Sequence, residues 1–156
     1  MSSHFQIERI EHMVSLFEDN PDLFNQNLIP EIKAKGESRV VATLPLNNHE
    51  TYGETILFIN EKYKEDGTIE EYRYGWELSQ RLKKIGKSSR HIFAFDKQKH
   101  PEPPHNVDTD PYHHHHVPGD IKPRTETIVE TLEDVVSILK DYIVGQKEYN
   151  ESHHFL

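Results

Sequence analysis

The residues best suited to chemistry in this 156-residue sequence gather in one histidine-rich segment, residues 97–124. It holds His100 and a run of four consecutive histidines, His113–His116. Imidazole titrates near neutral pH, so it can serve as a general acid or a general base. In an extended backbone, His113 and His115 would share one face and the other two histidines of the run would share the opposite face. We therefore take His100, His113 and His115 as candidate acid–base or phosphate-contacting groups.

The same segment could instead bind a metal ion. Imidazole and carboxylate groups are ligands for zinc, manganese and iron. The candidate ligands are Asp96, His100, His105, His113 and His115. A zinc or manganese site is thus the alternative to acid–base chemistry without a cofactor. A solvated loop that binds no ligand is the third interpretation.

A basic cluster is the second notable feature of a chain whose formal net charge is -9. Five cations and no acid fall within ten residues: Arg81, Lys83, Lys84, Lys87 and Arg90. Cations beside aromatic rings are typical of proteins that bind single-stranded RNA. The candidate RNA-binding residues are Tyr72, Arg73, Tyr74 and Lys84. The alternative is that the aromatic rings belong to the core and the cations to a solvated turn that discourages edge pairing.

Glutamates on or near the expected strands are a further source of chemistry: Glu54, Glu61, Glu70, Glu71 and Glu77. A Glu–His or Glu–Arg pair on a sheet could activate a 2′-hydroxyl of RNA and protonate the leaving oxygen. We expect most of these glutamates simply to occupy the solvent-exposed face of the sheet. The sequence has no glycine-rich phosphate loop, no G-x-S-x-G and no H-E-x-x-H, so nucleotide-binding and hydrolase motifs give no support.

The composition excludes several classes of protein. The absence of cysteine excludes disulfides, thiol catalysis and cysteine-ligated metal sites. No apolar run approaches the roughly 18–20 residues of a membrane helix. The first residues lack the basic and apolar regions of a secretion signal. We expect a cytoplasmic protein that does not associate with the membrane.

Helices are expected near both ends of the sequence. Apolar residues at helical spacing predict one over Gln6–Asp19: Ile7, Ile10, Val14 and Phe17. A longer apolar stripe predicts another near the C-terminus: Ile128, Leu132, Val135, Val136, Leu139, Tyr142 and Ile143. Thr131 and Asp134 have the spacing of a capping box before it, and Gly145 ends it.

Between the helices the pattern is that of β-strands. Four strands are expected: Arg39–Leu46, Thr55–Tyr63, Ile69–Leu78 and Arg90–Asp96. The dipeptide Asp66-Gly67 is a strong hairpin signal. The predicted fold is α+β, an antiparallel sheet of about four to five strands packed by the C-terminal helix, with an extra N-terminal helix.

The organisation along the chain follows from these elements. We expect an N-terminal helix and connector over residues 1–37 and an α+β domain over residues 38–146. The histidine-rich segment is expected to be a long irregular loop within that domain, because it is rich in proline and poor in aliphatic residues. Residues 147–156 form a tail.

Five pieces of sequence occur in a characteristic order: the strand Ile56–Glu61, the Asp66-Gly67 turn, the strand Tyr72–Trp76, Phe95-Asp96 with His100-Pro101, and the element His113–Val117. With these pieces in this order, residues 54–143 resemble the TumE family of toxin–antitoxin proteins. Two positions depart from the pattern. The family usually has an arginine before the aromatic–Asp pair and an asparagine after it, where this chain has Ala94 and Lys97. Arg90 and Arg73 are the candidates to replace that arginine.

The resemblance implies a small cytoplasmic toxin that is neutralised by an antitoxin protein. RNA or the ribosome would be its target, with ribonuclease-like chemistry by histidine and no required cofactor, and self-association stays open. Two other classes of function compete with it. One is the metal-binding module described above. The other is a non-catalytic interaction protein whose helix Ile7–Phe17 docks a partner.

Overall fold

The computed structural model describes residues 3–79, 91–97, 112–116 and 130–148, and gives the backbone alone for His91 and for Tyr112–His116. The elements along the chain are α1 (His4–Asp19), β1 (Glu31–Lys35), β2 (Arg39–Pro45), β3 (Thr55–Tyr63), β4 (Ile69–Leu78), β5 (His91–Lys97), β6 (Tyr112–His116) and α3 (Leu132–Ile143). The expected α+β arrangement is therefore confirmed, with a helix at each end and an antiparallel sheet between them.

The sheet has six strands in the order β1-β2-β3-β4-β5-β6, and each neighbouring pair is antiparallel. It is therefore a meander in which sequence neighbours are also spatial neighbours. The turn between β3 and β4 contains Gly67 at a φ of 88°. A side chain there would collide with the ring of Phe5, so both the backbone angle and the space favour glycine.

Two strands occupy segments that the sequence did not mark as strands. β1 lies in the expected connector. It was not recognised because it is short and its period-two pattern places only Ile32 and Ala34 toward the core. β6 lies in the expected irregular loop, where a run of histidines shows no alternation that would reveal a strand. These two strands raise the sheet from the four or five expected to six.

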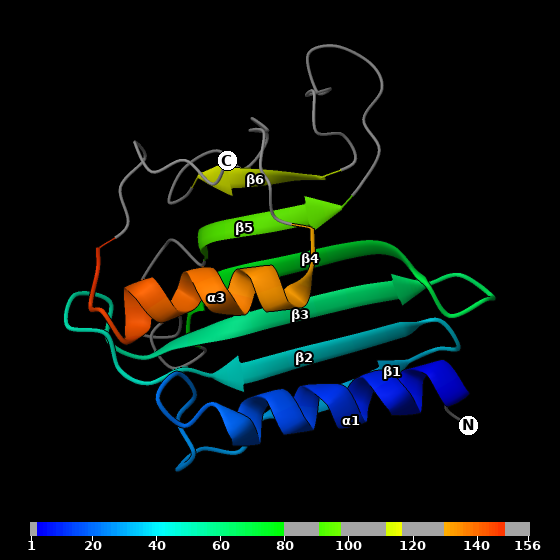
Figure 1. Cartoon of the computed structure of the whole chain (residues 1–156), viewed down its shortest axis with the longest axis horizontal. Coiled ribbons are helices and arrows are strands. Elements are labelled where there is room, and N and C mark those ends of the chain that lie inside the picture. Colours follow the sequence, from blue (N-terminus) through cyan, green and yellow to red (C-terminus); the bar gives the residue numbers. More distant parts are fainter. Residues whose placement is uncertain (1–2, 80–90, 98–111, 117–129, 149–156) are drawn as a thin grey trace.

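Both helices cover the same face of the sheet, with α1 over β1 and β2 and α3 over β4 (Figure 1). The core forms between them and includes Met13, Phe17, Trp76, Phe93 and Tyr142. Aromatic rings meet edge-on there, with the Trp76 and Phe93 centroids 5.4 Å apart. The aromatic face of β4 is thus core, which was the alternative interpretation of its alternating pattern.

The helix α1 turns a different side toward the sheet from the one that the apolar stripe predicted. Met13 and Phe17 are buried, but Ile7 is 46% exposed and Val14 is 37% exposed. The reason is polar: the side-chain amide of Gln6 is buried and donates hydrogen bonds to the carbonyls of Gly36 and Arg39 at 3.1 and 2.8 Å. These bonds rotate the first turns of α1 away from the aliphatic stripe.

A buried carboxylate fastens α1 to the sheet. Glu61 of β3 is fully buried and accepts hydrogen bonds from Arg9 of α1, Nε to Oε1 at 2.9 Å and Nη2 to Oε2 at 2.7 Å. The hydroxyl groups of Tyr63 and Tyr74 also donate hydrogen bonds to this carboxylate, at 2.7 and 2.5 Å. Burial lowers the pKa of Arg9, but the hydrogen bonds and charge of Glu61 raise it by more. The N-terminal helix therefore shares the core of the sheet.

Candidate functional site

The face of the sheet opposite the helices carries an ion pair between two neighbouring strands. Arg73 of β4 lies opposite Asp96 of β5 in the antiparallel register. The guanidinium donates Nε to Oδ1 at 2.7 Å and Nη2 to Oδ2 at 2.8 Å. Alternation places both residues on this face, since Tyr72, Tyr74 and Phe95 beside them point into the core. Two parallel bonds fix the orientation of both groups.

Within this pair the acidic side chain is more deeply buried than the basic one. Asp96 has 2% of its side chain exposed and Arg73 has 29%. Hydrogen bonds to Asp96 raise the pKa of Arg73, against the opposing effect of burial, and the charges of Asp96 and Glu77 raise it further. The pair with Asp96 uses Nε and Nη2 of the guanidinium. No described residue accepts a hydrogen bond from Nη1, so this nitrogen can donate to a bound ligand.

The register extends this pair to the histidine-rich strand. Asp96 lies opposite His113 of β6, and Ala94 lies opposite His115. One row of the sheet therefore reads Arg73, Asp96, His113 across β4, β5 and β6. Because β6 is extended, His113 and His115 occupy alternate register positions from His114, as expected of the run. Three chemically useful residue types thus meet in a single row, at spacings of about 5 Å between strands.

Two of the candidate RNA-binding residues lie in the core. Tyr72 and Tyr74 are 3% and 0% exposed, and their rings stack with centroids 4.2 Å apart. Burial raises the pKa of Tyr74, and the charge of Glu61 raises it further. Neither tyrosine has an exposed ring face on which a base could stack. Lys84, His100 and His105 lie outside the described residues.

The glutamates do not all lie on the exposed side of the sheet. Three of the five, Glu54, Glu70 and Glu71, are exposed or partly exposed, as was expected of most, whereas Glu61 and Glu77 are buried. The alternation of side chains along β3 could have predicted the burial of Glu61. This residue lies two positions from Ile59 and two from Tyr63, which are both on the core face. Arg9, its partner, was not singled out by the sequence at all.

The sequence profile of the family described as Toxin TumE matches residues 13–144 of the 156. The chain belongs to the TumE family. The match begins at residue 13, well before residue 54, where the resemblance was expected to begin, so it includes the C-terminal part of α1 and the first strands. No curated protein and no solved structure matches the chain.

The TumE match gives the site its context. The family is one of toxins in toxin–antitoxin systems, and it implies an antitoxin as partner. Ala94 stands at the position where an arginine was expected, and it is fully buried beside the row. Arg73 supplies a guanidinium to Asp96 from the neighbouring strand. Arg73 therefore has an observed contact to Asp96, while Arg90, the other arginine considered, lies outside the described residues.

The metal alternative has no support among the residues whose side chains are described. In that part of the chain no three His, Asp or Glu side chains come together to hold an ion. Of the five candidate ligands only Asp96 is included in that search, and its carboxylate is engaged with Arg73. None of the described helices is long and apolar enough to span a membrane.

Proposed function

We propose that this TumE-family chain is the toxin of a toxin–antitoxin pair and that it acts in the cytoplasm on RNA, free or in the ribosome. The observation that carries the proposal is the row Arg73, Asp96, His113 across three neighbouring strands. Acid–base groups and a phosphate-binding cation are the minimum that RNA cleavage through the 2′-hydroxyl requires. The toxin family supplies the biological setting in which such cleavage would be harmful.

The proposed reaction assigns one task to each group. The imidazole of His113 takes the proton from a 2′-hydroxyl, whose oxygen attacks the adjacent phosphorus. The bond from phosphorus to the 5′ oxygen breaks, and a second imidazole, from His115 or His100, gives that oxygen a proton. The Nη1 edge of Arg73 donates hydrogen bonds to the phosphate as negative charge grows on it. Asp96 acts as a positioning residue that holds the guanidinium.

This chemistry needs no metal ion, which separates it from the alternative of a metal-binding module. The test begins with expression of the chain in cells with and without the neighbouring antitoxin gene. We expect growth to stop without the antitoxin and to resume with it, and we expect purified protein to cleave RNA in the presence of EDTA. Harmless expression together with intact RNA would overturn the proposal. Cleavage that stops in EDTA and returns with zinc or manganese would replace it with the metal alternative.

A further inference from the structure

We propose that the face of β1, β2 and β3 opposite the helices binds the phosphate backbone of single-stranded RNA through Lys33, Lys35 and Arg39. This inference rests on the proposed function and names how the substrate would reach the site. Lys33 and Lys35 are exposed, and Arg39 is partly exposed. None of the three was among the candidate site residues that the sequence predicted.

The sheet register connects these cations to the candidate site. One row runs through Lys33, Val41, Asn60 and Arg73 to Asp96 and His113. It crosses all six strands, a width of about 24 Å at the usual strand spacing. The adjacent row places Lys35 opposite Arg39 and Arg39 opposite Lys62. A strand of RNA lying along these rows would pass from the lysines to Arg73.

The charges in the adjacent row are placed at a cost to the fold. Like charges directly opposite each other destabilise an antiparallel pair, and Lys35, Arg39 and Lys62 are in that relation on three neighbouring strands. Lys62 is offset by Glu70 at 3.4 Å. Within the described part of the chain, no acid forms an ion pair with Lys33, Lys35 or Arg39. Protection of the β1 edge would explain the two lysines but not Arg39 on an inner strand.

The rest of the surface makes this positive face stand out. The chain carries a net charge of -9, so a cluster of unpaired cations runs against its average. Glu8, Glu11 and Glu18 are exposed acids on α1, and that helix covers the other face of the sheet (Figure 1). Over β1, β2 and β3 the opposite face carries four cations, Lys33, Lys35, Arg39 and Lys62, against one exposed acid, Glu31, so it is net positive. A polyanion would meet repulsion over the helices and attraction over β1 and β2.

An aromatic ring and an amide on the same face favour RNA over an acidic protein segment as the occupant. Phe58 and Asn60 of β3 are partly exposed, and Asn60 Oδ1 accepts a hydrogen bond from Arg39 at 3.1 Å. Sheets that bind single-stranded RNA combine backbone cations with an aromatic ring on which a base stacks. Phe58 takes the stacking role that the buried Tyr72 and Tyr74 cannot take.

The test measures binding separately from cleavage. The probe is a fluorescein-labelled 2′-O-methyl oligouridylate, which has no free 2′-hydroxyl and so cannot be cleaved by the proposed reaction. Its affinity for the full chain is measured over a range of salt concentrations, for the wild type, for the double variant Lys33→Ala with Lys35→Ala, and for a control with Lys140→Ala and Lys147→Ala. The control removes the same charge from α3 and the residues after it, on the helix side of the sheet.

We expect the Lys33/Lys35 variant to bind about tenfold more weakly and the slope of log affinity against log salt to become shallower by about 1.4, since each lost phosphate contact contributes about 0.7. The control should match the wild type. Equal affinities of the two double variants would overturn the inference, whether or not RNA is cleaved. If the Lys33/Lys35 variant loses binding to the antitoxin but binds RNA as the wild type does, the inference is also overturned and the face is assigned to a protein segment. A wild type that binds but does not cleave would sustain this inference while contradicting the proposed reaction.

Discussion

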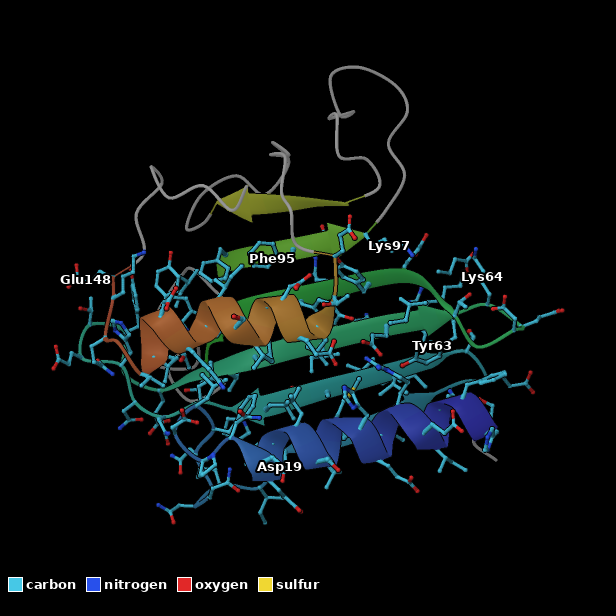
Figure 2. The ribbon with its side chains drawn as sticks, viewed as in Figure 1. Asp19, Tyr63, Lys64, Phe95, Lys97 and Glu148 are labelled. Carbon is cyan, nitrogen blue, oxygen red and sulfur yellow. The ribbon has the colours of Figure 1, made fainter. Side chains whose placement is uncertain are left out.

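The carboxylate of Asp96 is held by two parallel hydrogen bonds from Arg73, at 2.7 and 2.8 Å, on the face of the sheet away from both helices. Figure 2 labels Phe95 and Lys97, the neighbours of Asp96 on β5, of which Phe95 lies in the core. The strand therefore turns an aromatic ring to one side and a charged pair to the other. The core side fixes the position of β5, and that position in turn fixes the row that ends at His113.

Removal of Arg73 should destabilise the protein as well as inactivate it. Arg73→Met removes the guanidinium that holds the buried carboxylate of Asp96, and we expect the free energy of unfolding to fall by about 3–5 kcal/mol. Arg73→Lys keeps the charge but loses the two-pronged geometry, so it should cost less stability and still reduce toxicity. Urea denaturation followed by circular dichroism measures the first effect. An unfolding midpoint for Arg73→Met equal to that of the wild type would show that the pair is unimportant for folding.

The buried Glu61 makes a corresponding prediction for the N-terminal helix. Arg9→Met leaves the Glu61 carboxylate with two tyrosine hydroxyl groups and no cation, and we expect a loss of about 3 kcal/mol in the free energy of unfolding. Glu11→Gln changes an exposed residue of the same helix and should stay within about 0.5 kcal/mol of the wild type. If both variants unfold at the same urea concentration, α1 is not held by this cluster.

Stability should decline at alkaline pH because of buried tyrosines. Burial, with the charge of Asp141, raises the pKa of Tyr142 to about 12. The folded state therefore holds this proton more tightly than the unfolded chain, in which a tyrosine titrates near 10. The stabilisation is complete below pH 10 and is lost as the pH rises from about 10 to 12. Tyr142→Phe should lose stability less steeply over this interval, and an equally steep loss would refute the assignment.

The capping box of α3 can be tested with a matched pair of hydroxyl deletions. Thr131 Oγ1 accepts a hydrogen bond from the Asp134 amide at 3.2 Å, and Asp134 Oδ2 accepts one from the Thr131 amide at 3.1 Å. Thr131→Ala should lower the free energy of unfolding by about 1 kcal/mol. Ser137→Ala deletes an exposed hydroxyl in the middle of the same helix and should be neutral or slightly stabilising. Equal effects of the two substitutions would contradict a capping role.

Much of the fold followed from periodicity. The strands Thr55–Tyr63 and Ile69–Leu78 were predicted with the bounds they have, because the apolar run of the first and the alternation from Tyr72 to Leu78 in the second flank the Asp66-Gly67 turn. The C-terminal helix and its cap were also confirmed. The apolar stripe predicted the wrong buried side for the first turns of α1. A local pattern could not reveal that Gln6 is buried by two hydrogen bonds to carbonyl groups of the β1–β2 hairpin.

The site was predicted by residue type and not by arrangement. Arg73, Asp96 and His113 were each singled out, but for different tasks: RNA binding, metal ligation and acid–base chemistry. Their common row depends on the register of three strands, and a register is set by long-range pairing that a local pattern does not contain. Lys33 and Lys35 were missed for a related reason, because β1 alone is too short and polar to be recognised as a strand.

The central claim is that His113, in the row of Arg73 and Asp96, carries the toxic activity. It is tested most directly by growth of cells that express His113→Ala or His114→Ala at equal levels without antitoxin. The two histidines are neighbours in one strand, but His113 lies opposite Asp96 and His114 lies opposite Phe95. We predict that His113→Ala permits growth and that His114→Ala stops growth as the wild type does. Toxicity that survives in His113→Ala, or that is lost equally in both variants, would contradict the claim.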